Sequence, residues 1–281
     1  MVIGSRGLAL RSAVPKLGKK QANLHADFVH ALEHACEHVS ERRIDELVKR
    51  TAEEVYRVTG GRRVAYAWSG GKDSLALEYV MRAVGVASCV LVVCNLEMPS
   101  FLEWVAVHRP RELVIVNTGQ GLDWLAAHPE MLFPADANTA GKWFRVVQHR
   151  GQEKFSREHS LDFLMLGRRR ADGNYLGEKG IYKTRGCTRY SPIREWTHEE
   201  VFALIRYKNI ALPPVYDWPR GFRVGTGPWA KRRVPSHDAG FDEVWAIDPS
   251  IIRGAAAHPS PIFDGARACV ARHETQKSSR R

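Results

Sequence analysis

Cysteine is scarce in this sequence, and long apolar runs are missing. The 281 residues include five cysteines, an odd number at scattered spacings that gives no disulfide framework. We therefore expect a reducing, cytoplasmic environment. The longest apolar stretch, residues 84–94, is interrupted by Gly85 and Ser88 and is too short to cross a bilayer. Because no apolar segment of signal-peptide length follows the basic N-terminal residues, we expect no membrane partner.

Acidic residues are outnumbered by basic ones. Lysine and arginine together number 42 against 31 aspartates and glutamates, which gives a formal net charge of +11. A chain this basic favours anionic partners, which could be a nucleotide, a nucleic acid bound through the basic surface, or both. Part of the excess lies in the C-terminal tail, at Lys277, Arg280 and Arg281, where basic residues can also serve solubility alone.

A glycine turn between a strand and a helix is the most informative stretch, at residues 64–81. An apolar run of strand type meets the letters SGGKDS, and a helical pattern follows at once. Gly70 and Gly71 let an anion approach the unpaired amides at the start of the helix closely. Lys72 adds a cation, and Asp73 can cap the helix or help to hold Mg²⁺. The turn is therefore expected to bind an anion.

The spacing within this turn excludes two common phosphate-binding motifs. A Walker loop is excluded because Tyr66 stands where its first glycine belongs and Asp73 where its Ser or Thr belongs. No G-x-G-x-x-G follows the strand, which excludes a Rossmann fingerprint. SGGKDS resembles the PP-loop of the adenine nucleotide alpha-hydrolase superfamily, which includes ATP pyrophosphatases, tRNA-thiolating enzymes and the sulfonucleotide (PAPS) reductases. The alternative is a glycine-rich loop that binds no ligand.

Strands and helices are expected to alternate on both sides of this turn. Such a pattern predicts a doubly wound, mainly parallel α/β sheet with helices on both faces, as in adenine nucleotide alpha-hydrolase-like proteins. The expected strands are residues 64–68, 88–94, 112–117 and 162–166. Residues 129–141 are expected to form a loop, and residues 142–159 the helix that follows it.

The chain is expected to divide into three segments. Residues 1–60 are a basic arm followed by N-terminal helices, and residues 61–221 are the PP-loop nucleotide-binding domain. Residues 222–281 are a small C-terminal extension. Within it, residues 238–252 have a weak helical pattern, and residues 274–281 are expected to be a disordered basic tail.

Polar residues follow two of the expected strands at their carboxyl ends, where open parallel sheets bind ligands. Asn95 follows one strand, and the run Gly167-Arg168-Arg169-Arg170 follows another. Guanidinium groups bind phosphate or sulfate oxygens bidentately, so the arginine run is expected to bind an anion. Residues 171–190 are rich in glycine, lysine and arginine, and we expect them to form a lid over the anion.

A third block, the letters PIREWTHEEV followed by LPPVY, contains a helix start. Thr197 is the expected N-cap, and Glu200 completes a capping box. In this order, SGGKDS, GRRR and the third block resemble the PAPS reductase family over residues 64–221. The nucleotide-binding residues expected from the motifs and this similarity are Ser69, Gly70, Gly71, Lys72, Asp73, Ser74, Asn95, Gly167, Arg168, Arg169 and Arg170.

The sequence resembles the reductases but lacks the cysteine pattern that their reaction requires. A sulfonucleotide reductase attacks sulfate with a cysteine in a Glu-Cys-Gly-x-His context, and some relatives add paired cysteines for an iron–sulfur cluster. Neither pattern is present, so no iron–sulfur cluster is expected. The candidate thiols are Cys187, in the expected lid, and Cys269. His273 could lower the pKa of Cys269, and inert packing is the alternative role for that cysteine.

The expected reaction is cleavage at the α-phosphate of an adenine nucleotide. ATP with Mg²⁺ would place its β and γ phosphates on the loop, and an acceptor would be adenylated with release of pyrophosphate. The catalytic residues expected are Lys72, Asp73 and Arg168. The reaction is expected to serve nucleic-acid modification or sulfur transfer. Two alternatives stay open: a thiol-dependent PAPS reductase, and a non-catalytic protein that binds a nucleotide or a nucleic acid.

Overall fold

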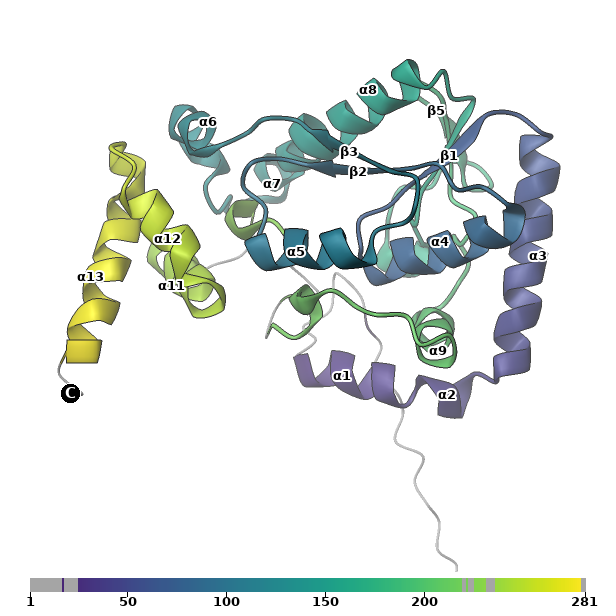
Figure 1. Cartoon of the computed structure of the whole chain (residues 1–281), viewed down its shortest axis with the longest axis horizontal. Coiled ribbons are helices and arrows are strands. Elements are labelled where there is room, and N and C mark those ends of the chain that lie inside the picture. Colours follow the sequence, from purple (N-terminus) through teal and green to yellow (C-terminus); the bar gives the residue numbers. More distant parts are fainter. Residues whose placement is uncertain (1–16, 18–24, 219–220, 222–224, 231–235, 279–281) are drawn as a thin grey trace, which may run out of the picture.

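A six-stranded sheet forms the centre of the protein (Figure 1). The computed structural model describes residue 17, residues 25–218, residue 221, residues 225–230 and residues 236–278. Its strands are β1 (Val64–Ala67), β2 (Cys89–Val93), β3 (Leu113–Asn117), β4 (Phe163–Met165), β5 (Ile181–Lys183) and β6 (Thr188–Tyr190). They lie in the order β3-β2-β1-β4-β6-β5, and all neighbours are parallel except β5 and β6. The predicted mainly parallel α/β sheet is confirmed.

Helices cover both faces of the sheet, because its central strands are apolar on both sides. Figure 1 shows α4 (Lys72–Val84), α5 (Pro99–His108) and α9 (His198–Tyr207) below the sheet and α8 (Arg150–Glu158) above it, while α7 (Ala137–Trp143) precedes α8 in the chain. Above the sheet, Phe155 packs with Ala65 and Leu164 in a compact cluster. Below it, the larger core reaches outward through α9 to the N-terminal helices.

The predicted N-terminal helices are confirmed as three successive pieces. They are α1 (His25–Glu33), α2 (Ala35–His38) and α3 (Glu41–Thr59). Ser40 caps α3 by accepting a hydrogen bond from the backbone N–H of Arg43, and Gly60 ends the helix at a φ of 55°. The helices α1 and α2 pack on α9, and α3 packs on α4 and α9. The predicted basic arm over residues 1–22 lies outside the described residues except for residue 17.

The expected loop over residues 129–141 is helical in most of its second half. After α6 (Leu122–Ala127) and a 3₁₀ turn (Pro129–Met131), the side chain of Asp136 caps α7 by accepting from two backbone N–H groups. The chain then continues through a π-helical stretch (Phe144–His149) into α8 without a break. The prediction placed the helix start at Lys142 because Gly141 and Asn138 favour loops, whereas the Asp136 cap starts it a turn and a half earlier.

The lid expected over residues 171–190 is wrong in its second half. Residues 181–190 form β5 and β6, which extend the sheet beyond β4. Both strands have three residues, and they carry basic side chains without the alternation of apolar residues that identifies a strand. The strands β5 and β6 are stabilised because β6 pairs with β4. Since β4 is brought beside β6 only by the tertiary structure, the local sequence does not indicate this pairing.

The C-terminal extension is a helical unit of α11 (His237–Ile247), α12 (Pro249–Ala256) and α13 (Asp264–Ser278). Figure 1 shows it beyond α5, at the end of the molecule opposite α3. Phe241 joins it to the core through edge contacts with Phe133 and Trp229. The disorder expected for residues 274–281 is wrong for residues 274–278, which continue α13, and residues 279–281 lie outside the described part. Within the described residues, every helix is too short or too polar to cross a membrane.

Candidate functional site

The SGGKDS turn connects the carboxyl end of β1 to α4. Gly70 has a φ of 67°, which only glycine adopts without strain, and Gly71 is the N-cap of the helix. Ser74 closes the turn on itself. Its hydroxyl donates to the carbonyl of Gly71 at 2.9 Å and accepts from the backbone N–H of Ser69 at 3.1 Å. The serines therefore hold the backbone of the turn in one shape.

This shape leaves backbone donors available at the helix start. Among the described residues, the N–H groups of Gly70 and Asp73 have no hydrogen-bond acceptor. The N–H of Lys72 donates instead to the hydroxyl of Tyr216, at 2.7 Å. Because α4 has 13 residues, its macrodipole adds to the positive potential of these amides. The turn can accept an anion through its backbone, as the sequence predicts for a phosphate loop.

Aromatic side chains limit the space beside Gly70. A β-carbon at this position would lie 2.9 Å from the Trp104 ring and 3.1 Å from the Phe101 ring. Trp104 in turn stacks on Trp68, with ring centroids 5.8 Å apart. Glycine is needed at position 70 both for its backbone angle and for this close packing.

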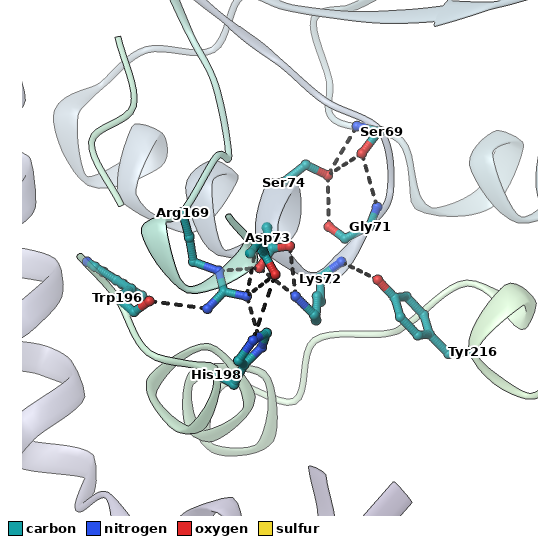
Figure 2. A network of polar contacts seen from close by, with 10 residues as sticks. Ser69, Gly71, Lys72, Asp73, Ser74, Arg169, Trp196, His198 and Tyr216 are labelled. Atoms are coloured by element: carbon teal, nitrogen blue, oxygen red, sulfur yellow. Dashed lines mark hydrogen bonds and ion pairs between the residues drawn. The ribbon is translucent and has the colours of Figure 1, made fainter. Parts of the chain in front are cut away.

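The side chain of Asp73 accepts hydrogen bonds from two cations (Figure 2). Lys72 Nζ lies 2.8 Å from each carboxylate oxygen, and Arg169 Nε lies 2.7 Å from Oδ1. Burial opposes ionisation of Asp73, but the charges of Lys72 and Arg169 outweigh it and hold the pKa of this carboxyl below its usual value. Burial lowers the pKa of Lys72, and Asp73 partly offsets that effect.

Arg169 is fully buried and joins three segments of the chain. Its guanidinium contacts Asp73, the carbonyl of Trp196 at 3.1 Å and the carboxylate of Asp172 at 3.2 Å. It also donates to Nδ1 of His198 at 3.0 Å, which leaves the imidazole proton on Nε2. Burial, followed by the charges of Arg169 and Lys72, lowers the pKa of His198 to about 4. His198 is therefore neutral at physiological pH.

Gly167 explains why the arginine turn can reach the loop. A β-carbon on Gly167 would lie 2.8 Å from the carbonyl oxygen of Asp73 and 3.1 Å from the backbone nitrogen of Ser74. Only glycine lets the exit of β4 pass this close to the first turn of α4. The neighbouring strands β1 and β4 therefore deliver SGGKDS and GRRR to one place, as predicted from their common edge.

The three consecutive arginines have different surroundings. Arg169 is buried against Asp73, and Arg170 is exposed and pairs with Glu195 at 2.9 Å. Arg168 donates to the hydroxyl of Tyr182 at 3.0 Å and lies 3.5 Å from Nε2 of His149. Burial and the charge of Arg168 lower the pKa of His149. In the described part of the chain, Arg168 contacts neutral groups and no carboxylate, so its charge is the one in this run that is free for an anion.

Asn95 lies at the same edge, on the other side of β1. Its side chain accepts from Asn117 Nδ2 at 2.6 Å and donates to the carbonyl of Gly119 at 3.3 Å. It is exposed and joins the carboxyl ends of β2 and β3. Its expected contact with a nucleotide remains a prediction.

The loop does not fit a Mg²⁺ ion held by Asp73. Both carboxylate oxygens of this residue already accept hydrogen bonds from Lys72, and one accepts from Arg169 as well. A hard cation bound there would have to displace two cationic side chains from a partly buried carboxylate. The geometry argues against the predicted role of Asp73 as a metal ligand.

A known protein family matches the part of the chain that contains this site. The model of the phosphoadenosine phosphosulfate reductase domain matches residues 63–225, more than half of the chain and the whole of the loop, the arginine turn and α9. The chain belongs to this family. A comparison with curated proteins finds no match.

Solved structures with a similar fold are distant in sequence. Phosphoadenylyl-sulfate (PAPS) reductase from Candida auris, in a phosphate complex, is 17% identical over 64% of this chain and 92% of that chain, with a TM-score of 0.45. FMN adenylyltransferase from Candida glabrata, in complex with FMN and the ATP analogue AMPCPP, is 12% identical over 70% of this chain and 71% of that chain, with a TM-score of 0.42. At these values the likeness is too distant to assign an activity.

In this member of the PAPS reductase-domain family, Cys187 lies at the wrong edge of the sheet for chemistry at the loop. It directly precedes β6, whose first residue, Thr188, is in register with Phe163 at the start of β4. The loop follows the opposite, carboxyl ends of these parallel strands. The thiol donates to the hydroxyl of Ser156, at 3.4 Å. Cys187 therefore belongs to no lid over the anion site.

Cys269 is also separated from the loop. It lies on α13, and Figure 1 shows α11 and α12 between that helix and α4. Its side chain is fully buried and donates to Asp242 at 3.2 Å. Burial and Asp242 raise the pKa of Cys269 to about 12, so the expectation that His273 lowers it is wrong. The family's loop is present, but neither candidate thiol is near it.

Three residues of the site carried no sequence signal for the role they have. Tyr216, in the segment after α9, contacts the loop directly, whereas Asp172 in the arginine turn and His198 on α9 contact Arg169. Asp172 lies one turn after Arg169 in a 3₁₀ helix, and His198 is the first residue after the predicted Thr197 cap. Their polarity was visible, but their partners are set by packing between segments far apart in sequence.

Proposed function

We propose that this protein binds an adenine nucleotide at the SGGKDS loop and cleaves it at the α-phosphate, as an ATP pyrophosphatase that adenylates an acceptor. The observation that supports this most directly is the start of α4, where the N–H groups of Gly70 and Asp73 have no acceptor within the described part of the chain and Gly70 has the left-handed conformation. Membership in the PAPS reductase-domain family supports an adenine nucleotide as the ligand.

The chain's own groups would divide the work as follows. The backbone amides of the loop bind terminal phosphate oxygens, and Arg168 stabilises the charge that develops when pyrophosphate leaves. The ammonium group of Lys72 is held by Asp73, and its side chain is only 12% exposed. It stabilises the loop through Asp73. Arg169 acts in the same way, by fixing Asp73 from the other side.

An anionic acceptor fits the surface next to Arg168. His149, which contacts Arg168, lies between Arg145 and Arg150, and both of these arginines are exposed. A cationic surface next to the site where the α-phosphorus would lie favours a nucleic acid as the group that is modified. This acceptor is part of the proposal and is tested separately from nucleotide binding.

The decisive comparison uses two glycines with left-handed backbone. Gly70→Ala adds a β-carbon that meets the Trp104 and Phe101 rings, whereas Gly85→Ala adds one that meets nothing within 4 Å. Both replacements carry the conformational cost of roughly 1–2 kcal/mol for a residue other than glycine. Binding of a non-hydrolysable ATP analogue, measured by calorimetry, is expected to disappear in Gly70→Ala and to persist in Gly85→Ala.

Turnover is then measured with α-labelled ATP, with single-stranded DNA, RNA or no acceptor present. Pyrophosphate and labelled product are expected from the wild-type protein, and strong loss is expected for Arg168→Ala. Nucleotide binding without release of pyrophosphate under any of these conditions would overturn the catalytic part. Equal binding by both alanine variants would overturn the assignment of the loop.

The second candidate function is the thiol-dependent reduction of PAPS. The family takes its name from that reaction. Incubation of the protein with PAPS and a dithiol tests this possibility directly. We expect no sulfite, because both candidate cysteines lie away from the loop. Sulfite formation that is lost in Cys187→Ser or Cys269→Ser would replace the first proposal with the second.

A further inference from the structure

The C-terminal helical unit contains a cluster of three side chains of the types that bind metal ions. Asp242 projects from α11, and Cys269 and His273 lie one turn apart on α13. One ligand atom from each lies within 4.8 Å of the other two, and this is the one such group among the described residues. The cluster is separate from the loop and has no part in the function proposed above.

The distances within the cluster are close to those of a tetrahedral site. Zinc bond lengths of ~2.0–2.3 Å at tetrahedral angles place two ligand atoms ~3.3–3.7 Å apart. Here Cys269 Sγ lies 3.2 Å and His273 Nε2 lies 3.5 Å from Asp242 Oδ1. Trp245 stacks on the His273 ring at 4.9 Å, with the planes 11° apart, and so fixes its orientation.

We propose that Asp242, Cys269 and His273 bind Zn²⁺ and that the ion fastens α13 to α11. Sulfur, imidazole and carboxylate donors together select zinc among the abundant divalent cations, whereas oxygen donors alone would suit Mg²⁺ or Ca²⁺. Asp242 and His273 are each partly exposed, so solvent can supply the fourth ligand.

Binding requires two changes at the cluster, and both are local. The Cys269 S–H bond breaks, its proton goes to solvent, and the sulfur lone pair binds the ion. Arg272, whose guanidinium lies 2.7 Å from Asp242 Oδ1, moves off the carboxylate. Since its side chain is 42% exposed, it can return to solvent without breaking the core. Arg272 thus occupies the carboxylate in the metal-free protein and competes with the ion.

Because Arg272 competes with the ion, the proposal predicts variants that bind Zn²⁺ more weakly and a variant that binds it more tightly. Co²⁺, which takes zinc sites and absorbs light, is titrated into the untagged full-length protein. We expect a thiolate-to-cobalt charge-transfer band that Zn²⁺ abolishes. Cys269→Ala should remove the band and weaken Zn²⁺ binding by more than the ~10–100-fold that loss of an outer contact causes. Arg272→Gln should tighten binding, because it frees Asp242.

Matched controls separate this site from general metal binding. Cys187→Ala changes a cysteine outside the cluster and should bind Co²⁺ as the wild-type protein does. If Cys269→Ala fails to fold, judged by circular dichroism, His273→Gln replaces it, with the same loss of affinity expected. Absence of the charge-transfer band in the wild-type protein, or a band that persists in Cys269→Ala, overturns the proposal.

Discussion

Arg169 and Arg170 are neighbours in sequence with opposite surroundings. Arg169 has no exposed surface and pairs with two carboxylates, and Arg170 pairs with Glu195 on the surface with 65% of its side chain exposed. The arginine run could be recognised in the sequence, but the run itself does not indicate which member is structural. That difference arises because only Arg169 points back toward α4 at the close approach made by Gly167.

The different surroundings of Arg169 and Arg170 can be tested by replacing each arginine and measuring the free energy of unfolding. Arg169→Met leaves Asp73 and Asp172 in the interior without their shared partner, and loss of one partner of a buried ion pair costs about 3–5 kcal/mol. We expect a corresponding loss in the free energy of unfolding by urea. Arg170→Met, the control, removes an exposed pair and should leave the unfolding curve close to that of the wild-type protein. Equal effects would contradict the assigned environments.

His198 makes the stability of the protein depend on pH. Its pKa is lowered to about 4 in the folded protein, by burial and by the charges of Arg169 and Lys72, while an unfolded histidine titrates near 6.5. The unfolded state therefore binds more protons between these values, and stability is present above pH 6.5 and lost as the pH falls toward 4. At about 1.4 kcal/mol per pKa unit, the loss approaches about 3 kcal/mol.

The measurement compares urea unfolding of the wild-type protein and His198→Gln between pH 7 and pH 4.5. The carboxylates near the histidine, including Asp73, Asp172 and Glu199, are present in both proteins, so the difference between the curves isolates the imidazole. We expect the wild-type protein to lose more stability than the variant over this interval. Parallel curves would show that His198 keeps an ordinary pKa.

Residues of the site could be predicted from sequence where their chemistry is local. The glycines and serines of SGGKDS act within the turn that they form, and the structure shows those local hydrogen bonds. Lys72 was expected to face a phosphate because its charge is suited to one. In the structure its ammonium group contacts Asp73 and lies over the Phe202 ring, and its contact with a phosphate remains a prediction. Side-chain direction depends on neighbours that the motif does not contain.

At the scale of elements, a glycine in α8 allows that helix to pack closely on the sheet. Gly151 packs against β2 so closely that a β-carbon would lie 2.3 Å from Cγ1 of Val92. The π-helical stretch from Phe144 to His149 runs directly into α8. A residue that looks like a helix breaker in the sequence therefore allows the closest contact between this helix and the sheet.

Gly141, in α7, is a matched control for Gly151. A β-carbon at Gly141 would meet nothing within 4 Å, so Gly141→Ala should stabilise the protein by about 0.5–1 kcal/mol through helix propensity. Gly151→Ala gains the same propensity but overpacks α8 on Val92, and should destabilise by about 1–3 kcal/mol. Thermal unfolding followed by circular dichroism measures both. A stabilising Gly151→Ala would show that α8 sits farther from the sheet.

Elements with strong local signals could be predicted, and those that depend on partners could not. The capping box of Thr197 and Glu200 is present as predicted, and Gly85 ends α4 in the left-handed conformation. The strands β5 and β6 were missed because three-residue basic strands lack periodicity and exist through pairing with β4. The helix α13 was also missed, and the polar sequence of its last turn resembles a tail.

At the scale of the whole molecule, the sheet's order brings the chemistry to one edge. Strand β1 lies between β2 and β4, so Asn95, the SGGKDS loop and the arginine turn come together from three separate stretches. This arrangement could be predicted from the alternation of strands and helices, because parallel strands share their carboxyl edge. The position of the C-terminal unit could not, since it depends on the Phe133, Trp229 and Phe241 contacts.

The same strand order has a consequence for the growing chain on the ribosome. Asp73 and Arg169 are 96 residues apart, so at ~5–20 residues per second the loop waits on the order of 5–20 s for its buried partner. During this interval β1 also lacks β4 on one side, while β2 and β3 are already available on the other. The SGGKDS loop is thus among the earlier segments to be synthesised but can take its final form only after the arginine turn has emerged.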